Sequence, residues 1–325
     1  MDKRESEYYK QERLKKSKEE PKENTKRIDY DISSSEKKEA RKTIKDLLDV
    51  DYVEFVKKLK KNAHDPKVKT VLNLGKKDGI ADEAIKVTEV SLTAKNLRPT
   101  QSQIGLADSL AWLAKNNPEG ADNLIKGDTS TFNENRILTA NNKYILDGHH
   151  RWSQVFLFNP DAKIPSVNLT IPGMDEGTDL LKVVQLAIAA TYGDIKMKPA
   201  SAPTDIFNDK VMSEKQIREK IPVLMGDKMT EVAKKSWGLK SSDEVYDKIT
   251  SNAVLLKKYK SEGSPERLYM PQPSDTAKDV GEPTNDYKGM PSAFIKKVQS
   301  GDLNFKEPIL AENRKWVKTF EQFRK

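Results

Sequence analysis

A short hairpin near the middle of the chain constrains the fold more than any other feature of the sequence. Residues 136–140 and 143–146 are largely apolar and strand-like. Asn141 and Asn142 lie between them, and asparagine tolerates the positive φ angles that a tight two-residue turn demands. Five residues then follow in the order Asp147-Gly-His-His-Arg151. The chain is therefore predicted to reverse in a hairpin and to leave its second strand through a short, mostly polar turn.

The residues after this turn predict a buried helix. Its apolar residues recur at helical spacing; they are Trp152, Val155, Phe156 and Phe158. Asn159-Pro160 ends the helix, because the residue before a proline avoids the helical region. We expect Trp152 to belong to the core rather than to stack on a base. Alternation of apolar residues over 164–171 then predicts a further strand.

The sequence on both sides of this segment predicts an α+β domain over residues 85–195, with a small mixed sheet and flanking helices. Apolar residues at 87, 90 and 92 indicate a strand. Residues 97–100 indicate a turn, and residues 103–114 a helix. Residues 180–190 are strongly apolar and predict a buried helix.

Composition changes before this domain. Residues 1–42 are rich in Lys and Glu and poor in large aliphatic side chains, which predicts a charged, flexible tail. Residues 43–84 predict a helical lead-in with one apolar stripe, formed by Tyr52, Phe55, Val56 and Leu59. Proline at position 66 ends that helix, and we expect the nearby His64 to be a surface residue.

Residues 196–325 predict a mainly helical C-terminal region. Ser213 and Gln216, and likewise Ser241 and Glu244, have the spacing of a capping box at the start of a helix. Residues 263–291 predict a loop, and residues 313–323 a last helix. These helices give no clear helix-turn-helix signature with a basic recognition face.

Composition excludes several classes of chemistry. The 325 residues include no cysteine, so disulfides, thiolate catalysis and Cys-ligated zinc are all excluded. The net charge of +8 arises from 58 basic and 50 acidic residues. Such a small excess is compatible with nucleic-acid binding, but solubility is the preferred explanation. No stretch approaches the ~20 apolar residues of a membrane span, so we expect no membrane partner.

The turn between the hairpin and the helix has the chemistry of an anion site. Gly148 permits a sharp change of direction. The helix after it has unpaired N–H groups and the positive end of its dipole at its start, and both attract phosphate. His149, His150 and Arg151 add side-chain donors. Asp147 could hold Mg²⁺, orient a histidine or cap the helix.

Two segments resemble a known superfamily. Ile145-Leu-Asp-Gly-His-His-Arg-Trp152 resembles the signature turn of the ParB/sulfiredoxin superfamily, and Leu97-Arg-Pro-Thr-Gln-Ser-Gln-Ile104 resembles the proline-containing motif of ParB-like domains, many of them encoded by tailed phages. The resemblance covers residues 85–195. Members of this superfamily bind nucleotides by their phosphates at this turn: ParB partition proteins bind CTP, sulfiredoxins use ATP, and free-serine kinases have a closely similar turn.

The resemblance implies a nucleotide (ATP, ADP or CTP) as cofactor, together with Mg²⁺. It implies catalytic roles for Asp147, His149 and His150, with Asp147 as the metal ligand. The phosphate-binding residues that it implies are Pro99, Thr100, Gln101, Gly148, His149, His150 and Arg151.

The sequence departs from the superfamily at two points. Sulfiredoxins need a cysteine in the turn, and a histidine stands there in this chain, so sulfinic-acid reduction is excluded. The serine kinases use a glutamate near the upstream motif as base, whereas this chain has Gln101 and Gln103. Glutamine cannot take a proton, so the nearest substitutes are the carboxylates of Asp108, Glu134 and Asp147.

Three functions follow, in order of preference. The first is an enzyme: a phosphotransferase or nucleotide hydrolase, with nuclease action as a variant. The second is a ParB-like protein that binds nucleotide or DNA without turnover. The third is a phage structural or interaction protein with a degenerate site, which would contact phage or host proteins through residues 1–42 and the C-terminal helices. We expect a cytoplasmic protein, in the host cytoplasm or the virion if a phage encodes it.

Overall fold

The computed structural model describes residues 34–74, 85–133, 135–171, 174–197, 203–271 and 292–303. Residues 1–33 of the predicted tail, Glu134, most of the predicted loop 263–291 and the helix predicted at 313–323 lie outside these ranges. The described residues belong to one compact unit.

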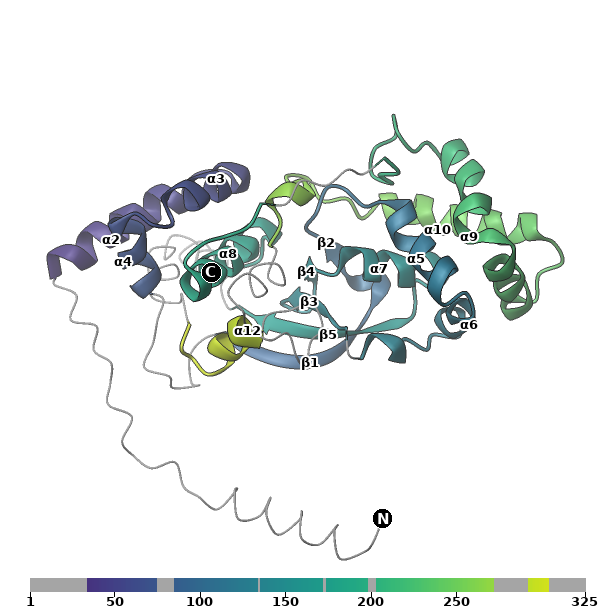
Figure 1. Cartoon of the computed structure of the whole chain (residues 1–325), viewed down its shortest axis with the longest axis horizontal. Helices are drawn as coiled ribbons and strands as arrows, with labels where there is room; N and C mark the ends of the chain where they lie inside the picture. Colours follow the sequence, from purple (N-terminus) through teal and green to yellow (C-terminus); the bar gives the residue numbers. More distant parts are fainter. Residues whose placement is uncertain are drawn as a thin grey trace, which may run out of the picture. The chain divides into compact units, whose positions relative to one another are not determined.

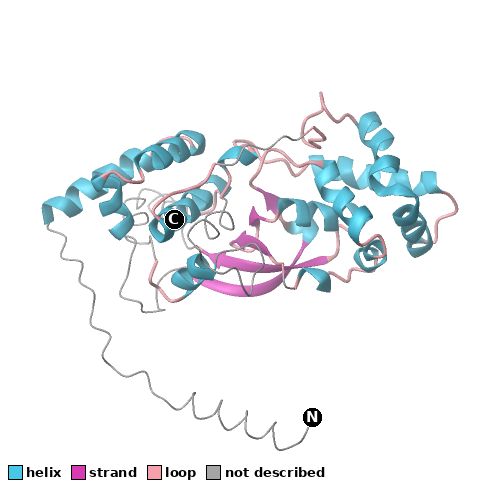
Figure 2. Cartoon of the chain, viewed as in Figure 1, coloured by secondary structure: helices cyan, strands magenta, loops and turns pink. Residues whose placement is uncertain are grey.

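A five-stranded mixed sheet forms the centre of this unit (Figures 1 and 2). The strands are β1 (Lys86–Thr93), β2 (Arg98–Pro99), β3 (Ile137–Ala140), β4 (Tyr144–Asp147) and β5 (Lys163–Thr170). Their spatial order is β1-β5-β3-β4-β2. β5 with β3 and β4 with β2 are parallel pairs, and the other neighbours are antiparallel. The prediction of a mixed α and β fold is confirmed, but Arg98 and Pro99 form an edge strand rather than a turn.

The hairpin between β3 and β4 forms as the sequence predicts. Asn141 and Asn142 have φ angles of 50° and 55°, and the Lys143 N–H donates to the Ala140 carbonyl at 3.0 Å. The Asn141 side chain also accepts from the Ile171 N–H at 2.8 Å. This bond links the β3–β4 turn to the residue after β5. Asn141 therefore helps to fix the register of β3, β4 and β5.

The two faces of the sheet are covered by different helices. Side chains alternate along a strand, so Leu138 and Leu146 join the core beneath α8 (Gly177–Tyr192), whereas Ile137 and Ile145 join the core beneath α7 (His149–Phe158). Trp152 is fully buried in the second core, and its indole N–H donates to the Ala94 carbonyl at 2.8 Å. The prediction that Trp152 is a core residue is therefore confirmed.

The α8 face is also contacted by helices from the two ends of the described chain. These are α2 (Ser34–Leu48), α3 (Tyr52–Asn62), α4 (Pro66–Leu74) and α12 (Ser292–Gln299). The Lys182 ammonium of α8 donates to the carbonyls of Leu48 and Val50, which joins α8 to the end of α2. The stripe predicted in α3 is buried, and His64 is exposed. The predicted tail boundary at residue 42 falls inside α2, which packs on α4.

The α7 face is covered by α5 (Leu106–Asn116), α6 (Gly120–Ile125), α9 (Glu214–Trp237) and α10 (Ser242–Lys257). Three short 3₁₀ helices join these parts: η1 (Ala94–Asn96), η2 (Ser130–Phe132) and η3 (Arg267–Tyr269). Because α9 and α10 share one hydrophobic core with α5 and α7, the C-terminal region completes the domain around the sheet.

Three helix details differ from the prediction. α5 begins at Leu106 rather than at Gln103, because Asp205 accepts the Ile104 N–H at 3.0 Å and Gly105 has an extended backbone. α9 is interrupted at Gly226, where φ is 64°. The capping box at Ser213 is complete, whereas at Ser241 only the serine half forms, because Glu244 accepts from the Lys240 N–H instead. None of the described helices combines the length and the apolar character of a membrane span.

Candidate functional site

Gly148 forms the turn between β4 and α7. Its φ angle is 90°, and a Cβ atom added there would lie 2.6 Å from the Ile137 Cγ2 atom. Only glycine fits both the angle and the space. α7 begins at the next residue, so its first N–H groups, which have no acceptor within the helix, are presented immediately after the strand.

The His149 ring is a buried connection between α7 and the edge strand β2. It is 5% exposed, and its Nε2 atom accepts the Thr100 N–H at 3.2 Å. The ring also forms a hydrogen bond with the backbone of Ile145, whose carbonyl accepts from the Thr100 hydroxyl at 2.5 Å. Burial, aided by the positive charges of His150 and Arg151, lowers the pKa of His149 to about 3. The ring is therefore neutral and fully hydrogen-bonded at neutral pH.

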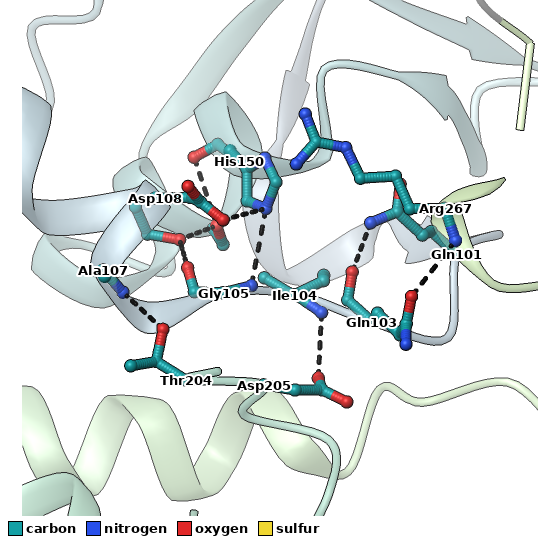
Figure 3. Close-up of polar contacts among 12 residues, drawn as sticks. Gln101, Gln103, Ile104, Gly105, Ala107, Asp108, His150, Thr204, Asp205 and Arg267 are labelled. Atoms are coloured by element: carbon teal, nitrogen blue, oxygen red, sulfur yellow. Dashed lines mark hydrogen bonds and ion pairs between the residues drawn. The ribbon is translucent and has the colours of Figure 1, made fainter. Parts of the chain in front are cut away.

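The His150 ring lies between Asp108 and Gly105 (Figure 3). Its Nε2 atom is 3.5 Å from the Asp108 Oδ2 atom and 3.4 Å from the Gly105 nitrogen. One nitrogen cannot serve both partners at once: with a proton it donates to the carboxylate, and without one it accepts the Gly105 N–H. The position of a single proton thus decides which contact forms. Burial is the largest cause of the lowered pKa of His150, and Asp108 opposes it.

Arg151 is held by two side chains. Its Nη2 atom donates to the Asp147 Oδ2 atom at 3.1 Å, and its Nη1 atom donates to the Asn135 Oδ1 atom. The Nε atom is buried and has no hydrogen-bond partner. Asp147 was predicted to hold Mg²⁺, orient a histidine or cap the helix, and its observed hydrogen bond is instead with Arg151. Gly148, as the N-cap residue, supplies no side-chain cap.

Gln101 and Gln103 form structural hydrogen bonds. Gln101 is buried, and its amide nitrogen donates to the Gln103 carbonyl. The Gln103 side-chain oxygen accepts the Arg267 N–H at 3.3 Å. Both amides therefore shape the segment that leads into α5.

Arg267 is a site residue that the sequence did not reveal. It lies in η3, within a C-terminal segment that runs along the residues after β2: Pro265 accepts the Ser102 N–H at 2.8 Å, and Ser261 donates to the Pro99 carbonyl at 3.2 Å. In Figure 3 its side chain and the His150 ring lie on the same side of the 103–105 segment. Its positive charge contributes to the lowered pKa of both His149 and His150. No local motif marks it, because only tertiary packing brings it there.

A cavity of about 210 Å³ lies beside α7. Its polar lining includes Asp108, Asn135, His150 and Arg151, and its apolar lining includes Trp112, Leu113, Leu124 and Phe132. The structure thus brings together three of the predicted site residues. Pro99 and Thr100 line a separate cavity of about 270 Å³ with Gly177. Glu134 lies outside the described residues.

In the part of the chain that the structure describes, no three histidine or carboxylate side chains gather to hold a metal ion. The Asp147 carboxylate, the predicted Mg²⁺ ligand, is paired with Arg151. Among the described side chains, Asp147 is therefore engaged by the arginine and does not belong to a metal-ligand cluster.

No family model, no curated protein and no solved structure matches this chain.

Proposed function

We propose that this chain is a ParB/sulfiredoxin-type phosphotransferase or nucleotide hydrolase that acts beside the start of α7. One observation carries the proposal: the His150 ring, within 3.5 Å of Asp108, lines the same cavity as Arg151. A proton-transfer pair and a guanidinium group therefore face one space.

The phosphates of a nucleoside triphosphate would bind at the first N–H groups of α7. Arg151 and Arg267 would balance their charge, since guanidinium groups favour phosphate oxygens. His149 then has a positioning role, because its ring fixes the Thr100 backbone against α7. Any Mg²⁺ would arrive with the nucleotide and be held by its phosphates.

The Asp108–His150 pair would manage the proton. The oxygen of a hydroxyl group or water attacks the terminal phosphorus and forms the new P–O bond. Its proton passes to the pair, and the bond to the departing nucleoside diphosphate breaks with its electrons. A lowered pKa keeps His150 neutral at pH 7, so the ring can accept a proton. Asp108 thereby provides the carboxylate that Gln101 and Gln103 cannot.

A second candidate is a nucleotide-binding protein without turnover. The hydrogen bonds of Gln101 and Gln103 favour it, because the segment in which related kinases have a base is structural in this chain. DNA and protein partners are proposals that rest on the sequence alone.

Two measurements test the proposal. A melting-temperature panel with ATP, ADP, CTP and GTP, each with Mg²⁺, should show stabilisation by at least one nucleotide; ligand at 100 times its Kd adds about 2.7 kcal/mol. Phosphate release or transfer is then compared between the wild type and His150→Ala and Asp108→Asn. His64→Ala is the matched control, because His64 is exposed and far along the chain from α7.

We expect both site variants to lose turnover and the control to keep it. Nucleotide stabilisation without turnover in the wild type would select the second candidate. No stabilisation by any of the nucleotides would refute both.

A further inference from the structure

The cavity beside α7 has two chemically different parts. Asp108, His150 and Arg151 line it with groups that bind or move protons and anions. Leu113 and Phe132, both buried, line it with apolar surface. A ligand that fills this cavity must therefore have a polar part and an apolar part.

Trp112 is the unusual residue of the apolar part. Its side chain is 63% exposed although it lines the cavity. Among the described large hydrophobic residues, only Val223 and Leu255 are also exposed, and neither lines this cavity. Neither core contains the indole of Trp112, so core packing does not account for it. An exposed aromatic face at a cavity mouth is typical of a surface on which planar rings stack.

Trp112 of the apolar lining and Asp108 of the polar lining lie close together. Both residues belong to α5 and are four positions apart, so their side chains lie on one helix face with roughly 5–6 Å between their Cβ atoms. Asp108 lies about one helical turn from Trp112. A substituent on a planar ring stacked on Trp112 could therefore reach Asp108 and the neighbouring His150.

We propose that this cavity is the acceptor site of the phosphotransferase and takes a nucleoside-type compound, with its planar ring on Trp112 and a hydroxyl group at the Asp108–His150 pair. This inference rests on the proposed function. A volume of about 210 Å³ is below the roughly 300–1,000 Å³ usual for drug-sized ligands. The cavity, which is open at Trp112, therefore suits a compound no larger than a nucleoside, whereas a whole nucleoside triphosphate would exceed it.

The transfer balances with the donor already proposed. The acceptor hydroxyl oxygen forms a bond to the terminal phosphorus of the nucleoside triphosphate, and the proton of that hydroxyl passes to the Asp108–His150 pair. The P–O bond to the nucleoside diphosphate breaks, and the diphosphate leaves with the bonding electrons. The products are a phosphorylated acceptor and a nucleoside diphosphate.

Calorimetric titration of the full chain with adenosine, guanosine, cytidine and thymidine tests the inference, with free ribose as the ring-free control. We expect at least one nucleoside to bind and ribose not to bind. Trp112→Ala should weaken that nucleoside about 5- to 150-fold, the range that corresponds to the loss of one aromatic stacking partner. Trp112→Phe should retain most of the affinity, and Val223→Ala, which removes another exposed hydrophobic side chain, should retain all of it.

Binding that is equal in the wild type and Trp112→Ala would overturn the inference, as would the absence of binding by all four nucleosides. Competition between the bound nucleoside and a nucleoside triphosphate would also overturn it, because the ring on Trp112 would then be that of the donor. Nucleoside binding through Trp112 without any phosphate transfer would support the ring site while refuting the proposed function, so the two failures are distinguishable.

Discussion

The surroundings of His149 and His150 differ, although the two residues are adjacent in the first turn of α7. On one side, His149 is buried and bonds to the backbone of Thr100, directly after β2, and of Ile145 in β4. On the other side, His150 faces a cavity and has two competing partners for one nitrogen. Adjacent histidines in one motif thus have opposite environments. One histidine of this motif is enclosed by backbone hydrogen bonds and the other lines a cavity, and only tertiary contacts tell them apart.

The largest effect on turnover is expected for His150, the histidine that lines the cavity. His150→Ala should lower phosphate transfer or hydrolysis by roughly 10²–10⁴-fold, the usual contribution of a general acid–base group. His149→Gln, which keeps a neutral hydrogen-bonding side chain, should lower it far less. Steady-state kinetics of the two variants, with folding checked by circular dichroism, decide the matter. Equal losses of turnover in His150→Ala and His149→Gln would contradict the different roles given to the two histidines.

The next effect concerns the buried side and depends on pH. The pKa of His149 is lowered to about 3 in the folded chain, whereas in the unfolded chain it is about 6.5. The unfolded state therefore binds the proton first, and stability is lost as the pH falls from about 6.5 towards 3. Between pH 7.5 and 5.0 this residue should cost about 2 kcal/mol, at 1.36 kcal/mol per unit.

Denaturant unfolding at the two pH values measures that loss. The loss should be smaller by a similar amount in His149→Gln and unchanged in His64→Ala, because His64 is exposed. An identical pH dependence in the wild type and His149→Gln would contradict the buried, neutral state of this ring.

The turn itself gives the next prediction. Gly148→Ala should destabilise the fold by about 2–3 kcal/mol, because the new Cβ atom would lie 2.6 Å from Ile137 and the φ angle is 90°. Gly193→Ala is the matched control: φ is 74° there, but no atom lies within 4 Å of the added Cβ. It should cost about 1 kcal/mol. Thermal unfolding of both variants tests whether the close approach of β3 adds to the cost of the backbone angle.

The smallest effect on stability is expected at Asp108. Its side chain is 47% exposed, and Asp108→Asn should change the free energy of unfolding by only about 0.5 kcal/mol. The same substitution should strongly lower turnover. Urea unfolding and kinetics on one preparation measure both. A large loss of stability would mean that the Asp108–His150 contact is a structural one, like the contacts of His149.

The local part of this fold was predictable from the sequence. Periodicity located the strands at β3, β4 and β5 and the helix α7, and Asn141 with Asn142 identified the turn, because these signals depend on neighbours in the chain. The pairing of Arg98 with β4, the late start of α5 and the break at Gly226 were not predictable. The first two depend on partners distant in the sequence, such as Asp205 for the start of α5.

Some residues of the candidate site were also predictable from local sequence, and others were not. His150 and Arg151 were found from the motif, and Asp108 was one of three carboxylates left open. Arg267 was missed because the C-terminal segment that places it has no motif of its own, and its position follows from bonds to Ser102 and Gln103. Trp112 lies on the helix face of Asp108, but without the cavity nothing distinguished it from a core residue.

Histidine NMR can follow each ring separately, because the chain has only three histidines: His64 is exposed, His149 is buried and His150 lines the cavity. On titration with the nucleotide that stabilises the chain most, with Mg²⁺, the ring signals of His150 should shift. Those of His149 should move little, because its ring is already hydrogen-bonded to Thr100, and those of His64 should not move. A response at His149 or His64 with none at His150 would contradict the account.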